Sequence, residues 1–152
     1  MFKRIALLAF VIVGTMSLQT SAQWSGATAA TIPAFHPAAP AATDKLAPLL
    51  KPDELFGDNA QFPYQTHAYE LAPKISKVIY QQPCYCYCDR SGHKSLHTCF
   101  EGTHGAECST CLKELYFSYL ETKKGKTATQ IRAAIVRGDW KQIDLANAAA
   151  IR

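Results

Sequence analysis

The sequence lacks the patterns that mark several large functional classes. Its formal net charge is only +4, and without Lys3 and Arg4, which lie in a predicted leader, 14 basic residues face 12 acidic ones, a net +2. Nucleic-acid binding calls for a clustered basic surface, which this balance does not supply. The sequence has no glycine-rich phosphate loop, no hydrolase order of Ser, His and Asp, and no carboxylate pair placed for acid–base work. The sequence therefore favours a binding protein over an enzyme, and it predicts that this protein binds neither a nucleotide nor a nucleic acid.

A membrane-spanning run is also missing. The apolar run at residues 5–14 has about ten residues, whereas a spanning helix needs about 20. Two basic residues precede this run, and small residues follow it up to Ala22, which is the layout of a secretory signal. We predict that residues 1–22 are a signal peptide cleaved after Ala22. The mature chain then has no transmembrane segment and is periplasmic or extracellular.

Charged side chains are absent from residues 23–43. This stretch holds eight alanines and three prolines and shows no sustained apolar period, which is typical of an extended or mobile linker. Residues 44–60 mix leucines with prolines and read as a lead-in. We therefore assign residues 23–60 to an Ala/Pro-rich linker and lead-in, and residues 61–152 to a cysteine-rich domain.

Helical periodicity is clearest after the last cysteine. A single apolar stripe predicts a helix that ends at Gly125, and its members are Leu112, Leu115, Tyr116, Tyr119 and Leu120. Extended backwards, the stripe includes Cys108 and Cys111, so this pair should face inward at the start of the helix. Thr127 and Gln130 have capping-box spacing and start a second helix.

The remaining segments give weaker signals. The second helix should end at Gly138, and a third should start at Asp139. A short helix is expected at residues 66–71, stopped by Pro73. Residues 75–82 are β-prone and should lead in extended form into the first cysteines. The fold class is mainly α: a small helical domain with an irregular cysteine-rich segment, preceded by the signal peptide and the linker.

The cysteines do not follow the common spacings for haem, thioredoxin or zinc-finger sites. Covalent haem needs Cys-x-x-Cys-His, and residue 112 is Leu. The βαβ context of a thioredoxin site is missing, and a single Cys-x-x-Cys pair does not supply four zinc ligands. Exported chains permit disulfides, so three structural bridges remain one reading of six cysteines.

All six cysteines fall within residues 84–111, and they are Cys84, Cys86, Cys88, Cys99, Cys108 and Cys111. Disulfides stabilise a fold more when they close long loops, and bridges within so short a window would close only short ones. Alternate residues of an extended segment share a face with Cα atoms about 6.5 Å apart, which suits convergence on one point better than a bridge. The inward pair in the helix can close on the same point.

Six thiolates exceed one tetrahedral zinc and suit a soft ion, with Cu(I) first and Zn next. His104 and His97 are expected to support the site, since His104 precedes Cys108 by four residues and His97 can share a helix face with His93. The role would be binding, buffering or delivering metal, with a metal-accepting or redox protein as partner. Two alternatives stay open: thiol–disulfide exchange at Cys108 and Cys111, and a disulfide-stapled interaction module.

Four motifs in this order resemble the exported bacterial proteins named for a PCYCGC motif, the broader CYCxC group. They are PCYCYC at residues 83–88, SLxxCF at 95–100, HGAxCxxC at 104–111, and GK at 125–126 followed by IR at 131–132. The resemblance covers residues 66–137 and implies a small exported domain without fixing an activity. Tyr87 stands where the name-giving motif has glycine, and the lipid-bearing cysteine of many relatives is absent.

Overall fold

The structure is a computed structural model that describes residues 32–152. The predicted signal peptide and the first part of the linker, residues 23–31, lie outside the described residues. Within residues 32–152 every regular element is helical and no strand forms, so the predicted mainly α fold is confirmed. No helix of this part of the chain has the length and apolar character needed to cross a membrane.

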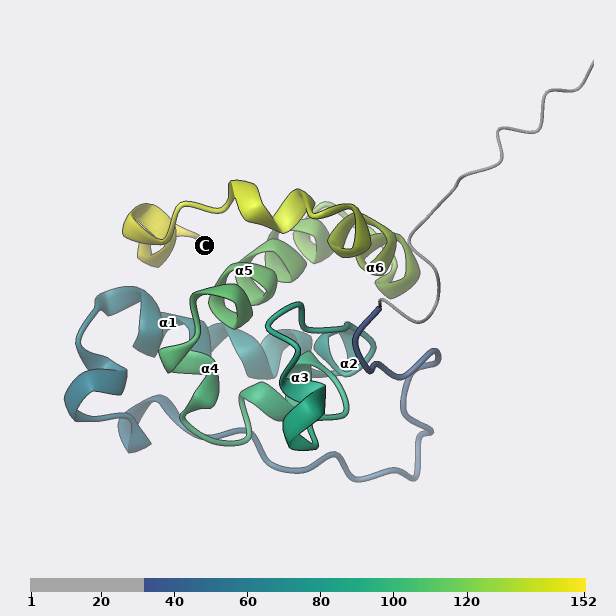
Figure 1. The fold of residues 1–152 in the computed structure, drawn as a ribbon, viewed down its shortest axis with the longest axis horizontal. Coiled ribbons are helices and arrows are strands. Elements are labelled where there is room, and N and C mark those ends of the chain that lie inside the picture. The colour runs from purple at the N-terminus through teal and green to yellow at the C-terminus, as the bar shows by residue number, and fades with distance from the viewer. Residues whose placement is uncertain (1–31) are drawn as a thin grey trace, which may run out of the picture.

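The central element is α5, Ser109–Lys123. In Figure 1 it runs through the middle of the domain, with α1 to α4 below it and α6 above. These neighbours are α1 (Pro63–Leu71), α2 (Ser76–Ile79), α3 (Leu96–Cys99), α4 (His104–Glu107) and α6 (Ala128–Arg137). Most of the stripe predicted from the sequence is buried, since Cys111, Leu112, Leu115, Tyr116 and Tyr119 belong to the main core, whereas Cys108 and Leu120 are half-buried.

The C-terminal part follows the predicted capping signals. Thr127 caps α6 through its side-chain oxygen, which accepts a hydrogen bond from the Gln130 amide at 3.3 Å. Gly138 ends the helix in the left-handed conformation, with φ of +86°. A 3-10 helix, η6 (Asp139–Gln142), follows and places Trp140 beside α6 in a second small core. A last 3-10 helix, η7 (Leu145–Ala150), packs on α1.

The prediction of an extended segment at residues 75–82 was wrong. After α1 the chain continues as the 3-10 helix η4 (Ala72–Ile75) and then α2. The helix predicted at residues 66–71 corresponds to α1, which ends at Leu71 as expected. Pro73 then occupies an early position of η4, where no intrahelical amide is needed. Ala68, Ala72, Ile75 and Ile79 are buried three to four residues apart. This helical spacing outweighs the weak alternation that suggested a strand.

The described part of the lead-in packs along the edge of the domain (Figure 1). It contains two 3-10 helices, η2 (Pro52–Glu54) and η3 (Gly57–Ala60). Leu55 belongs to the main core, and the Leu50 amide donates to the Phe100 carbonyl at 2.9 Å. The core therefore already includes side chains ahead of residue 61, where the sequence places the start of the domain.

Candidate metal centre

The first three cysteines lie on a tight turn, residues 84–88, which we call the motif turn. The Tyr87 amide donates to the Cys84 carbonyl at 3.1 Å, which closes the turn, and the 3-10 helix η5 (Cys88–Ser91) follows directly. The expectation of an extended start was therefore wrong. The sulfurs converge because the chain folds back on itself, and not because alternate side chains share one face of a strand.

Tyr87 completes this turn in an unusual backbone conformation. Its φ of +58° and ψ of +31° are left-handed, and among the non-glycine residues of the described chain only Tyr87 has a positive φ. This conformation favours glycine, because a Cβ crowds the following carbonyl. The Tyr87 side chain is exposed and lies edge-on to Tyr85, with the Arg90 guanidinium over its ring. Tyr87 therefore does not cover the sulfurs.

The helix α5 supplies the second pair of cysteines. Cys108 is the residue that precedes its first turn, and its carbonyl accepts the Leu112 amide at 3.0 Å. Cys111 lies in the first turn and is fully buried, whereas Cys108 is half-buried. The apolar stripe of the helix thus turns this pair toward the motif turn.

The short helices α3 and α4 supply Cys99 and His104. Cys99 ends α3 and is fully buried, and His104 opens α4. The two helices approach closely at Gly105, where a Cβ would lie 2.8 Å from the Cys99 carbonyl oxygen and 2.9 Å from the Phe100 ring. Glycine is therefore required at this point, and its small size lets His104 reach the thiols.

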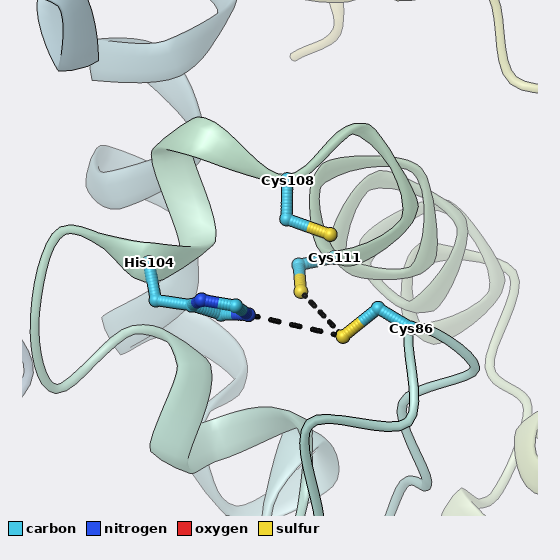
Figure 2. Close-up of side chains that lie close together, drawn as sticks. All are labelled: Cys86, His104, Cys108 and Cys111. Atoms are coloured by element: carbon cyan, nitrogen blue, oxygen red, sulfur yellow. Dashed lines mark hydrogen bonds between the residues drawn. The ribbon is translucent and has the colours of Figure 1, made fainter. Parts of the chain in front are cut away.

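Figure 2 shows four side chains pointing toward one another: Cys86 from the motif turn, His104 from α4, and Cys108 and Cys111 from α5. Their ligand atoms all lie within 4.8 Å of one another. The Cys86 sulfur is 3.6 Å from that of Cys111 and 3.8 Å from His104 Nε2. We call these four residues the outer group, because Cys86 and Cys108 are half-buried and His104 is exposed.

A second set of four donors lies deeper. It consists of Cys88, His93, Cys99 and again His104, within the same 4.8 Å limit, and we call it the inner group. The sulfurs of Cys88 and Cys99 are 3.3 Å apart, and His93 Nδ1 lies 3.3 Å from the Cys99 sulfur. Cys88 and Cys99 are buried and His93 is half-buried.

Cys84 lies between the two groups. Its sulfur is 3.3 Å from Cys86 and 3.3 Å from Cys111, both in the outer group. It also forms sets of close ligand atoms with Cys99 and with Cys88 of the inner group. The structure thus brings all six predicted cysteines into one continuous centre, in which all six are free.

The histidines divide differently from the prediction. His97 Nδ1 lies 2.8 Å from the Glu101 carboxylate, and no set of close ligand atoms contains it. His93 does not share a helix face with His97, because it precedes α3 in a loop. That loop turns His93 toward Cys99, and its imidazole lies edge-on to His104 with ring centres 4.9 Å apart. Sequence spacing alone gave no reason to prefer His93.

The thiols do not ionise alike, because each lies beside several others. Hydrogen bonds from Cys108, Cys111 and Cys84 hold the pKa of the Cys86 thiol below its ordinary value. The pKa of Cys111 is raised by its hydrogen bonds with neighbouring thiols, first Cys108, and by burial. Burial lowers the pKa of His104, but the hydrogen bond and charge of Cys86 outweigh it and raise that pKa. Cys86 is therefore favoured as thiolate, the form that binds metal.

A buried carboxyl group ties the motif turn to α5. Glu114 is fully buried on α5 and accepts a hydrogen bond from the Tyr85 amide at 2.9 Å. Burial raises the pKa of Glu114 to about 8. The side chain is therefore mostly neutral at pH 7 and adds little charge to the centre. Its effect is to hold the turn that carries Cys84 and Cys86 against the first turns of the helix.

The cysteine and histidine sets can hold a metal ion, and the comparisons agree with the family expected from the motifs. A family model described as "Protein of unknown function with PCYCGC motif" matches residues 5–142. No curated protein and no solved structure matches the chain.

Proposed function

Because this chain belongs to the family of proteins with a PCYCGC motif, we propose a function that rests on the cysteines for which the family is named. The chain binds a soft metal ion outside the cytoplasm and buffers it or delivers it to an acceptor protein. Cu(I) is the first choice of ion and Zn²⁺ the second. The outer group, Cys86, His104, Cys108 and Cys111, is where the ion enters and leaves.

The observation that carries this proposal is the convergence of four ligand atoms from three separate segments. In a tetrahedral site with metal–sulfur bonds near 2.3 Å, neighbouring sulfurs lie about 3.8 Å apart. The distances of 3.6 Å between the Cys86 and Cys111 sulfurs and 3.8 Å from Cys86 to His104 Nε2 are close to this value. An ion can therefore enter with small side-chain adjustments.

The donor types support the choice of ion. Thiolates select Cu(I) and Zn²⁺ over hard cations such as Mg²⁺ and Ca²⁺. The outer group has three sulfurs and one imidazole, and the neighbouring Cys84 adds a further sulfur within 3.3 Å of both Cys86 and Cys111. A sulfur-rich set of this kind favours Cu(I). The predicted signal peptide at residues 1–22 supports export as part of the proposal.

Exposure supports exchange of the ion with a partner. Cys86 and Cys108 are half-buried and His104 is exposed, while Cys111 is buried behind them. An acceptor thiol can therefore reach the ion from the side of Cys86 and Cys108 and replace these ligands one at a time. Such stepwise replacement moves an ion without releasing it to water.

Thiol–disulfide exchange by Cys108 and Cys111 is the competing function. It is less well supported, because the closest sulfur contacts, at 3.3 Å, join Cys84 to Cys86, Cys84 to Cys111, and Cys88 to Cys99. A disulfide-stapled module is less well supported too, since all six cysteines are free in the structure.

The test is a metal and thiol count on the exported chain, purified from a bacterial periplasm without chelators. We expect at least one Cu or Zn ion per chain, measured by elemental mass spectrometry, and strong loss of that ion in Cys86→Ser. Ser109→Ala is the matched control, because Ser109 lies beside Cys108 with an exposed side chain. A metal-free wild-type chain whose cysteines are all oxidised would refute the proposal. Metal-free chain that turns over disulfides would establish the competing function.

A further inference from the structure

We propose that the inner group is a second metal position, which holds Zn²⁺ and exchanges it slowly while the outer group exchanges its ion readily. This inference rests on the proposed function, since both ions are held within the same thiol centre. It gives the two ions different roles. The ion at Cys88, His93 and Cys99 is retained, and the ion at Cys86, Cys108 and Cys111 is exchanged.

The donor set of the inner group fits zinc. Two cysteines and two histidines form one of the common four-coordinate sets of structural zinc sites. The Cys88 and Cys99 sulfurs and His93 Nδ1 are joined by contacts of 3.3 Å, and His104 completes the set within 4.8 Å. The four residues are spaced along the sequence unlike the ligands of a zinc finger, so their spacing alone does not reveal the set.

Both positions can be filled at once because the six cysteines and the two histidines His93 and His104 together supply the eight donors that two four-coordinate ions need. His104 belongs to both groups, and Cys84 forms close sets with Cys99 and Cys111 and with Cys86 and Cys88. A thiolate sulfur has lone pairs for two ions, so Cys84 can complete the inner site or link it to the outer one. Cys84 is almost fully buried, at 2% exposure, which suits a link within the centre.

The two groups differ in their access to solvent. The exposed His104 belongs to both groups, so the difference lies in the cysteines: Cys99 is fully buried and Cys88 is 7% exposed, whereas two cysteines of the outer group are half-buried. Residues 33–36, which we call the N-terminal strap, lie against one side of the inner group through Pro33 and Ala34. Pro33 and Ala34 line a narrow void with Cys84, Cys88, Asp89, His93 and Ser95, and this void has no room for a water molecule.

The N-terminal strap is held by contacts at its edge. The Ala34 amide donates to Asp89 Oδ2 at 3.1 Å, directly beside Cys88. The Arg132 guanidinium lies over the Phe35 ring at 4.6 Å, and the His36 ring stacks on Tyr80 at 3.8 Å.

Ala34 is exposed, and Phe35 and His36 are only partly buried. Regions held by few buried contacts open without global unfolding. The strap therefore slows the exchange of the inner ion without preventing it.

The experiment loads the reduced exported chain with Zn²⁺ under nitrogen and removes unbound metal. The bound zinc is counted, and an excess of a chromogenic chelator then reports its release over time. We expect two zinc ions per chain, released in two phases of equal size whose rates differ by at least about tenfold, because one position needs local opening of the chain.

Substitutions assign the phases to positions. Cys108→Ser should remove the fast phase and leave one slowly released ion, while His93→Gln should remove the slow phase and leave the fast one.

Arg132→Gln should speed the slow phase without changing the zinc count, because Arg132 holds the Phe35 ring and the His36 carbonyl of the strap and is not itself a ligand. It also removes a hydrogen bond to the Gln81 carbonyl at 2.9 Å, so an unchanged zinc count is needed to show that the motif turn stays intact. Lys77→Gln is its control, since it removes the same charge from an exposed position on α2.

The possible outcomes separate the two proposals. A chain that binds one ion, or two that leave in a single phase, would overturn the inner position while leaving metal binding intact. A slow phase that Arg132→Gln does not speed would overturn the role of the strap. A chain that binds no zinc would overturn the inner position, while the metal and thiol count on the exported chain decides separately whether the chain binds Cu(I). The Cys108→Ser result decides the question even if His93→Gln folds poorly, because Cys108 lies at the half-buried rim.

Discussion

Alanine at Gly105 should separate the helix that carries His104 from the thiols. A Cβ at this position would lie 2.8 Å from the Cys99 carbonyl oxygen and 2.9 Å from two carbons of the Phe100 ring. Phe100 is fully buried and the Cys99 carbonyl is backbone, so neither can swing away. Touching atoms need about 3.5 Å, so α4 must retreat by roughly 0.7 Å.

The cost follows from two opposing effects. Overpacking of this kind destabilises a core by about 1–3 kcal/mol. Alanine in place of glycine in a helix returns up to about 1 kcal/mol. We expect Gly105→Ala to lower the free energy of unfolding by about 1–2 kcal/mol. Because His104 moves with α4, the affinity for Zn²⁺ should also fall by about 10–100-fold, the usual effect of disturbing a contact that orients a ligand.

The assay is urea unfolding of the reduced, metal-free chain, together with zinc affinity from competition with a chelator. Gly102→Ala is the matched control, because a Cβ at Gly102 meets no atom within 4 Å and its backbone is not left-handed. The control should unfold at a urea concentration at least as high as wild type does, and it should bind zinc with the same affinity. If Gly105→Ala matches Gly102→Ala in both measurements, the close approach does not position His104 and the reasoning fails.

Three further predictions concern the fold. Tyr87→Gly should be more stable than Tyr87→Ala in urea by about 1 kcal/mol, because φ at Tyr87 is +58° and a Cβ is strained there; equal stability would count against strain. Thr127→Ala should cost about 1 kcal/mol, since it removes the cap of α6, whereas Thr129→Ala, at an exposed position, should cost less. Burial lowers the pKa of His67. The unfolded chain therefore binds a proton at His67 more readily than the folded chain. The free energy of unfolding consequently decreases as the pH is lowered below about 6.5. Unfolding curves at pH 8 and pH 5 should show a steeper loss for wild type than for His67→Gln, and parallel losses would contradict the assignment.

Local signals predicted the C-terminal half of the fold. The apolar stripe of α5 and the capping box at Thr127 and Gln130 act within a few residues of chain. The same stripe predicted that Cys111 faces inward, and it is fully buried. Such elements are readable because the residues that decide them are neighbours in the sequence.

Elements decided by distant packing were predicted poorly. Residues 75–82 have β-prone side chains, yet the burial of Ile75 and Ile79 in a helical register with α1 makes residues 75–79 helical. The motif turn depends on a left-handed Tyr87, which propensity disfavours, and on Glu114 of α5, which lies 29 residues from Tyr85. Contacts across such intervals leave no periodic pattern.

The ligand histidines show the same limit. His97 and His93 looked equivalent in spacing, but His97 is 2% exposed and lies against Glu101, while a loop turns His93 toward Cys99. The set of six cysteines was readable because the residue type itself restricts the chemistry. Which histidine joins them depends on the path of the loop between η5 and α3.

The contacts of the N-terminal strap also bear on when the inner position becomes enclosed during folding. His36 reaches its contact with Arg132 across 96 residues of sequence, so the strap gains this contact only after residue 132 has been made. The contacts of the strap with Asp89 and Tyr80 need only the first 89 residues, so the enclosure of the inner position is completed in two stages. An ion bound at the second stage afterwards exchanges only slowly, so the compartment in which the chain folds selects the first ion that the inner position holds.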